Sequence, residues 1–62
     1  MYLDMDGKEI KIGSSACFKH GTEMYGRVTG FDRGMVQINV WDGDAGEYYS
    51  VSKAPRQCWQ EG

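Results

Sequence analysis

Cysteine and histidine are too scarce here to build a metal site or a disulfide scaffold. There are two cysteines, Cys17 and Cys58, a single histidine, His20, and no CxxC pair. A zinc site would need a carboxylate as fourth ligand, and two cysteines are too few to staple a small secreted domain. We therefore expect no metal and no cofactor. We expect both cysteines to remain reduced thiols. A disulfide between them is the alternative, because they fall on the first and last strands, which would be neighbours.

Long apolar runs are absent as well. Residues 1–6 carry two acids, unlike a signal peptide, and no stretch approaches the roughly 20 apolar residues of a membrane span. This pattern predicts a cytoplasmic protein with no membrane partner. Charge of one sign is also lacking: seven basic and nine acidic residues leave a net charge of −2. Broad, salt-driven nucleic-acid binding is therefore not favoured, although a local basic patch stays possible.

Helical periodicity is missing, whereas strand periodicity is clear. In residues 35–41, Val36, Ile38 and Val40 alternate with polar residues, which is the period-2 pattern of a strand with one buried face. Residues 25–31 read as its antiparallel neighbour across a turn at residues 32–34. Gly26 and Gly30 would share a side with Val28, where missing side chains let a strand coil. Gly30 is therefore expected to resist substitution.

The rest of the chain reads as further short strands separated by turns. Asp6-Gly7 predicts a hairpin turn within an N-terminal arm, residues 1–12. Residues 16–18 start the next strand, a polar loop covers 19–24, and a turn at 42–46 leads to a strand at 47–52. A helical turn at 53–56 with Ser52 as cap precedes a closing strand at 57–59. The side chains expected to point inward are Ile10, Ile12, Ala16, Phe18, Val28, Val36, Ile38, Val40 and Val51.

This order predicts an all-β, SH3-like five-stranded small barrel. The 62 residues form one domain, with the barrel at residues 16–60. Residues 13–21 and 26–31 resemble the plasmid type II dihydrofolate reductases in their glycine spacing and basic loop. That resemblance implies a tetrameric, NADPH-dependent enzyme with a lysine and a Gln-Ile-Tyr run lining its pore. The lysine position falls on Phe18, and the Gln-Ile-Tyr run falls on Glu47, Tyr48 and Tyr49.

A second resemblance is to the first Sm motif, carried by Gly26-Arg-Val-Thr-Gly-Phe-Asp-Arg-Gly-Met35. It implies an RNA-binding barrel, but the base-holding asparagine falls on Val36 and the second Sm motif is absent. The entry Gly7-Lys-Glu-Ile-Lys-Ile-Gly13 is more loosely similar to KOW and Tudor barrels. All of these likenesses imply the small-barrel fold.

No catalytic constellation is visible. No serine lies in a nucleophile elbow, and no glycine-rich loop opens a helix for phosphate. Asp42 and Asp44 belong to a turn, where aspartate bonds its own backbone, although a cation is the alternative. More aromatic residues are present than so small a core can bury. Those placed on a contact surface are Tyr25, Phe31, Trp41, Tyr48 and Trp59, and the basic residues that could flank them are Lys19, Arg27, Arg33, Lys53 and Arg56.

The aromatic surface has two interpretations. It could cover the open ends of the barrel or bury residues such as Met24, Phe31 or Trp41 in a homo-oligomer. It could instead be a platform for a peptide or for unpaired bases. We expect a non-enzymatic interaction module from a mobile element that self-associates and binds a protein or peptide. The alternatives are a nucleic-acid-binding barrel of KOW or Sm type and an oligomeric reductase.

Overall fold

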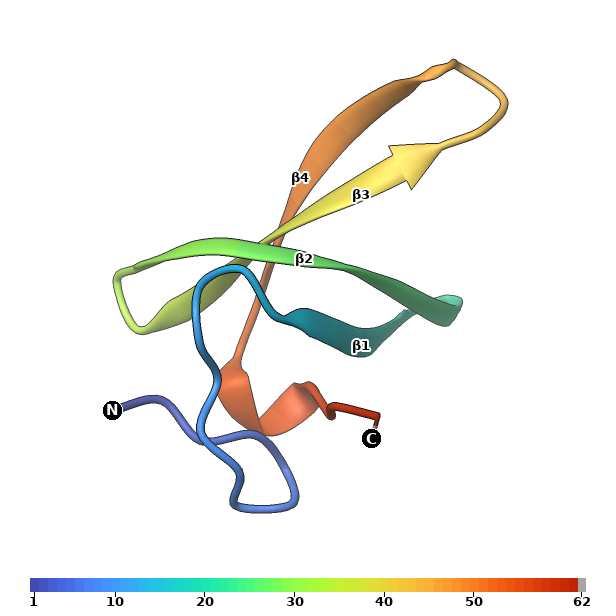
Figure 1. The fold of residues 1–62 in the computed structure, drawn as a ribbon. Helices are drawn as coiled ribbons and strands as arrows, with labels where there is room; N and C mark the ends of the chain where they lie inside the picture. Colours follow the sequence, from blue (N-terminus) through green and yellow to red (C-terminus); the bar gives the residue numbers. More distant parts are fainter. Residues whose placement is uncertain (62) are drawn as a thin grey trace.

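Four antiparallel strands form a single meandering sheet in the computed structural model, which describes residues 1–61. The strands follow one another in the order β1-β2-β3-β4, and a 3-10 turn, η1, comes after them (Figure 1). Their bounds are β1 Ser15–His20, β2 Thr22–Asp32, β3 Met35–Asp42, β4 Glu47–Lys53 and η1 Pro55–Gln57. The all-β prediction, with one short helical turn near the C-terminus, is confirmed.

The sheet is not closed into a barrel within residues 1–61. The expected closing strand at 57–59 is reduced to one antiparallel bridge between Cys17 and Trp59. The N–H of Cys17 donates to the Trp59 carbonyl at 2.7 Å, and the return bond measures 3.0 Å. This bridge covers the outer edge of β1. No segment within residues 1–61 covers the outer edge of β4 in this way.

The long strand β2 changes partner along its length. Its first half pairs with β1, from His20↔Thr22 to Ser15↔Arg27, and its second half pairs with β3. A register shift between Val28 and Gly30 adds one residue to β2. Because side chains alternate along a strand, this bulge inverts the alternation beyond Val28.

The bulge overturns two expectations about the faces of β2. Phe31 pairs with buried Val36 and packs against the core, instead of lying on the opposite face. Gly30 pairs with Gln37 on the outer side, instead of sharing the core side with Val28. Period-2 reasoning placed both residues wrongly because it assumed an uninterrupted strand.

Glycine and Arg33 make the turns tighter than expected. The polar loop expected at 19–24 is wrong: β1 and β2 run through it and meet at Gly21, whose φ is +79°. Between β2 and β3, Arg33 and Gly34 have φ of +55° and +78°, the paired positive values of a two-residue hairpin turn.

Ser52 does not cap η1. Its hydroxyl donates to Gln37 Oε1 at 2.9 Å, and the Ala54 N–H donates to the side chain of Gln57 at 3.3 Å.

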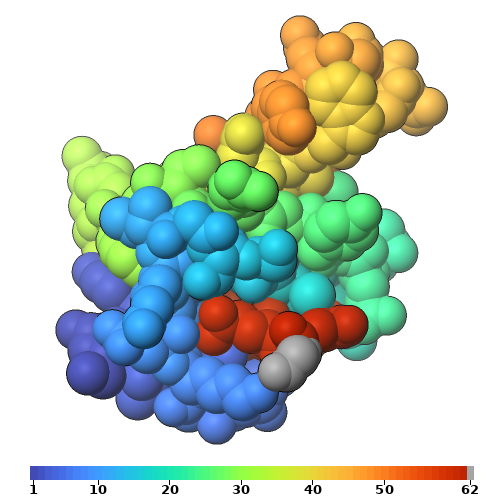
Figure 2. Space-filling model, viewed as in Figure 1, coloured from blue at the N-terminus to red at the C-terminus, as the bar shows by residue number. Residues whose placement is uncertain are grey.

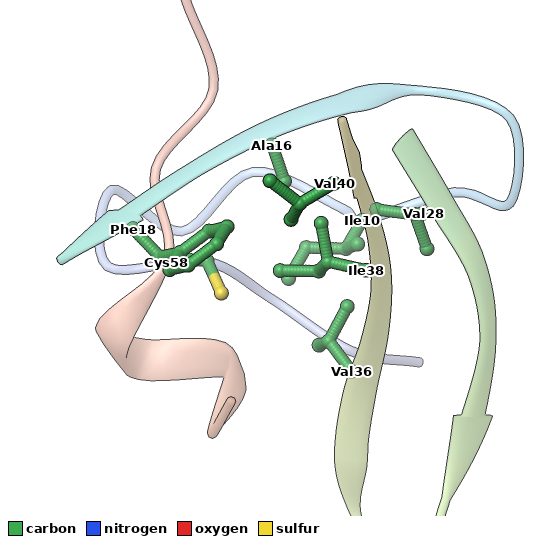
Figure 3. Close-up of a cluster of buried hydrophobic side chains, with 8 residues drawn as sticks. All are labelled: Ile10, Ala16, Phe18, Val28, Val36, Ile38, Val40 and Cys58. Atoms are coloured by element: carbon green, nitrogen blue, oxygen red, sulfur yellow. The ribbon is translucent and has the colours of Figure 1, made fainter. Parts of the chain in front are cut away.

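The hydrophobic core lies on the inner side of the curved sheet and is closed by the N-terminal segment and η1 (Figure 3). Its buried members are Ile10, Ala16, Phe18, Val28, Val36, Ile38, Val40 and Cys58. Val51 is only half-buried. The prediction that Ile12 points inward is wrong. Its side chain is 64% exposed because Ile12 lies in a turn, where strand alternation does not apply.

Asp4 organises the N-terminal arm, where the expected hairpin is reduced to the single bridge Leu3↔Glu9. The buried carboxylate accepts hydrogen bonds from the N–H groups of Asp6 and Lys8, each at 2.9 Å. Gln60 Nε2 donates to its other oxygen, also at 2.9 Å, which ties the C-terminal segment to the arm. Desolvation by burial raises the pKa of Asp4, but the bonds from Gln60, Lys8 and Asp6 lower it more, so the net pKa lies below the ordinary 3.8.

This lowered pKa makes a pH-dependent contribution to stability. A carboxyl whose folded pKa is depressed stabilises the fold fully above its unfolded value, and that contribution is lost as the pH falls through the folded value. Near neutral pH, Asp4→Asn is expected to lower the free energy of unfolding by about 1–2 kcal/mol. The gap between the variant and the wild type should shrink well below pH 3.8. Urea unfolding at the two pH values measures this; a gap that is constant with pH would contradict it.

Candidate functional site

A groove opens where β2 and β3 part from each other. The two strands pair from Asp32↔Met35 to Arg27↔Asn39, and beyond that point β2 continues along β1 while β3 continues along β4. The far end of the β3–β4 hairpin, yellow and orange in Figure 2, therefore stands away from the body. The groove between them has a volume of about 660 Å³. Its lining residues are Ser15, Glu23, Met24, Tyr25, Gly26, Arg27, Asn39, Val40, Trp41 and Tyr48.

Gly26 allows this divergence by letting β3 pass very close to β2. A Cβ at Gly26 would lie 2.4 Å from the carbonyl oxygen of Asn39 and 2.7 Å from Cγ2 of Ile38. Neither distance leaves room for a side chain, since the nearer atom belongs to the backbone. The absence of a side chain at Gly26 thus fixes how closely the strands cross at the base of the groove.

Three aromatic side chains dominate the walls of the groove. Trp41 and Tyr48 are cross-strand partners on β3 and β4, and their rings meet edge to face with centroids 5.0 Å apart. Tyr25 stands on the β2 side. These side chains are 55%, 62% and 74% exposed, respectively, so they form an apolar surface that the chain itself does not cover. Edge-to-face pairs of this kind are energetically favourable, so the two rings support each other's placement beside the groove.

The backbone of both walls also faces into the groove. Along a strand of an antiparallel pair, the backbone N–H and C=O groups of successive residues point alternately toward the partner strand and away from it. Cys17 bonds to Trp59, away from β2, so its cross-strand partner Tyr25 directs its N–H and C=O away from β1. On β3, the same alternation turns the peptide groups of Trp41 toward β2. No backbone bond within residues 1–61 joins these two positions, so both strand edges are available to an extended chain.

The other predicted aromatics take different places. Trp59 lines a smaller cavity of about 130 Å³ together with Cys17, Tyr25 and Met24. Tyr25 therefore lies between Trp59 on one side and the Trp41–Tyr48 pair on the other. Phe31 is not part of this surface, since its ring stacks on Tyr2 with centroids 4.3 Å apart. The structure thus brings four of the five predicted aromatics to one side of the molecule.

The predicted basic residues do not gather around the groove. Only Arg27 lines it, and Glu23 lines it as well. The Nζ of Lys53 lies 5.9 Å from the centroid of the Phe18 ring. Lys19, Arg33 and Arg56 are exposed on β1, the β2–β3 turn and η1. The charge around the groove is therefore mixed.

Sequence reasoning missed several residues that shape this site. Glu23 and Met24 were assigned to a loop, but they lie on β2 and line both cavities. Tyr49 was named only as the position of the reductase tyrosine, yet it packs against the core, and its hydroxyl lies 4.0 Å from the Met24 sulfur. Met24, Gly26 and Val28 occupy every second position of β2, and this alternation could have extended the predicted strand back to Met24.

The cysteines are both free thiols. Cys58 is buried and Cys17 is half-buried. Burial raises the pKa of both, and Glu61 and Glu23 add to the rise at Cys17. Thiols with raised pKa values are mostly protonated near neutral pH and are poor nucleophiles. Neither cysteine therefore has the environment of a reactive residue.

Two other kinds of site are not formed by the described part of the chain. Residues 1–61 contain no group of three or more histidine, cysteine, aspartate or glutamate side chains placed to hold a metal ion. They also contain no helix with the length and apolar character needed to cross a bilayer. No protein family, curated protein or solved structure matches the chain.

Proposed function

We propose that this chain is a non-enzymatic interaction module of SH3-like small-barrel type, with the groove between β2 and the β3–β4 hairpin as its binding site. The order of elements supports the SH3-like relationship. A four-stranded meander is followed by a single 3-10 turn, and Trp59, two residues beyond that turn, bridges back to β1. The bridge stands where the fifth strand of such a barrel would pair.

One observation carries the proposal of a binding site. Tyr25, Trp41 and Tyr48 are all more than half exposed around one groove, although aromatic side chains dominate the energetics of interfaces. The partner proposed is an extended protein segment. Its backbone can bond to the open strand edges at Tyr25 and Trp41, while its side chains contact the aromatic rings.

A nucleic-acid partner fits this site less well. A strand-binding groove normally combines aromatic stacking with a run of positive charge along the backbone path. Here Arg27 is accompanied by Glu23, and the whole chain carries a net charge of −2. The aromatic component is present, but the electrostatic component is not.

A displayed library of random peptides provides a defined probe for the groove. Peptides selected on the wild-type protein should bind Trp41→Ala at least about tenfold more weakly, because truncation of a central aromatic removes a dominant contact. Tyr25→Ala should act in the same direction. Ile12→Ala is the matched control, since the exposed fraction of Ile12 lies between those of Trp41 and Tyr25 but Ile12 lies outside the groove. Calorimetric titration of a selected peptide measures each change.

The same proteins separate the alternatives. Salt-dependent binding of a single-stranded oligonucleotide, lost in Trp41→Ala, would favour the nucleic-acid module. Turnover of dihydrofolate with NADPH would favour the reductase. Peptide binding that is unchanged by both aromatic substitutions would contradict the groove as the site.

A further inference from the structure

The outer edge of β4 ends the sheet without a neighbour. β4 pairs with β3 from Val36↔Lys53 to Asp42↔Glu47, and no other segment within residues 1–61 pairs with it. Because Asn39 and Trp41 direct their backbone groups toward β2, the alternate residues of β3 bond to β4. The residues of β4 whose N–H and C=O groups point outward are therefore Tyr48, Ser50 and Ser52. These donors and acceptors form a regular edge available to another strand.

This edge carries none of the features that usually prevent strands from adding. Exposed edges are normally interrupted by proline, by a bulge or by a charge in the middle of the strand. β4 contains no proline, its pairing with β3 has no register shift, and its charges lie only at Glu47 and Lys53. The opposite edge of the sheet, on β1, is covered at Cys17 by Trp59.

The sequence of β4 is self-complementary. When two copies run antiparallel with Ser50 opposite Ser50, Glu47 of one copy falls opposite Lys53 of the other, and this happens at both ends. If one copy is shifted along the other by two residues, each side chain stays on the same face of the joined sheet. In those registers, however, Glu47 no longer lies opposite Lys53. Opposite charges facing each other across an antiparallel pair are stabilising, and like charges are destabilising.

The same register also extends the core. Tyr49 and Val51 lie on the inner face of β4, where both are half-buried and packed against the core. They fall opposite each other across the two copies, and Tyr48 falls opposite Ser52 on the outer face. Each outward donor and acceptor of Tyr48, Ser50 and Ser52 then meets a partner from the second copy.

We infer that two copies of this chain form a symmetric dimer by antiparallel pairing of their β4 strands about Ser50, joining the two sheets into one. The outward backbone edge of β4 lies on the side of that strand away from β3, and Tyr48 is the one groove-lining residue that also belongs to this interface. A two-fold interface of this kind is isologous, so a single self-complementary strand is sufficient to build it.

Proline at Ser50 tests the backbone pairing. Ser50→Pro removes the outward N–H at the centre of the interface, whereas the edge position tolerates proline because that N–H is not used within the chain. Sedimentation across micromolar concentrations should show a dimer for the wild type and for the control Ser50→Ala, and a monomer for Ser50→Pro. Circular dichroism checks that the proline variant keeps its strands. A wild type that is monomeric throughout overturns the inference.

A charge exchange tests the register and does not depend on proline. Glu47→Lys alone and Lys53→Glu alone should each weaken dimerisation about tenfold, because both ends of the interface then carry like charges. The double exchange should restore the wild-type dissociation constant, because opposite charges face each other again. If the double variant is as weak as the single variants, the Ser50-centred register is wrong. If Trp41→Ala abolishes the dimer while Ser50→Pro and the charge variants leave it intact, the copies associate through the groove and β4 is not the interface.

Discussion

Gly26→Ala is expected to lower the free energy of unfolding by about 3 kcal/mol, a large share of the stability of so small a domain. The added methyl group would lie 2.4 Å from the Asn39 carbonyl oxygen and 2.7 Å from Cγ2 of Ile38. The first contact is with backbone, so β2 and β3 must move apart at their crossing. That movement would loosen the pairing of Arg27 with Asn39 and disturb the base of the groove.

Gly30→Ala is the matched control on the same strand. A Cβ at Gly30 meets no atom within 4 Å, and the residue does not have positive φ, so the structure gives no reason for the resistance to substitution that the sequence pattern predicted at Gly30. Alanine there is expected to be neutral or to stabilise by up to about 1 kcal/mol, because it restricts the unfolded chain. Chemical denaturation of the two variants measures the difference. Equal effects at the two glycines would show that the strand crossing does not depend on the missing side chain.

The second large effect is expected for Phe18→Ala, at about 4 kcal/mol of lost stability. Phe18 has no exposed surface and is the largest of the fully buried side chains. Its removal leaves a cavity between the sheet and η1, and it also removes the ring beneath the Lys53 ammonium group. A domain of this size buries only about 60% of its unfolded surface and has little reserve to offset such a loss.

Ile12→Ala provides the contrast, because the sequence pattern treats Ile12 and Phe18 alike. Ile12 is 64% exposed, so its truncation is expected to change stability by less than about 0.5 kcal/mol. Thermal unfolding followed by circular dichroism compares the two variants. A stable Phe18→Ala protein would mean that the core can collapse around the missing ring, and a strongly destabilised Ile12→Ala protein would place Ile12 inside.

The sequence by itself identified β3, β4, parts of β1 and β2, and most of the core. Alternation in residues 35–41 identified β3 and its inward side chains, because one face of a strand that packs on a core must be apolar at every second position. The same reasoning placed Ala16, Phe18 and Val28 correctly. The turn between β2 and β3 was visible from Gly34, because positive φ favours glycine, whereas Arg33 has positive φ without being a residue that favours it.

Only the tertiary structure decided where β2 shifts its register and which glycine is indispensable. One added residue between Val28 and Gly30 reverses the faces of Gly30 and Phe31, and no local pattern marks it. The need for glycine at position 26 comes from the close approach of Ile38 and Asn39 on the next strand, β3, and not from the φ of Gly26.

For the candidate site, too, one part followed from the sequence and the other part only from the tertiary structure. Exposed aromatics could be anticipated from a core too small to hold them, because burial capacity scales with chain length. Their grouping could not, because Tyr25 and Trp41 come together only where β2 and β3 diverge. The buried carboxylate of Asp4 was also invisible in the sequence, since its partner Gln60 lies at the other end of the chain. Local patterns report which face of a strand is apolar, whereas contacts between distant segments depend on how the whole chain packs.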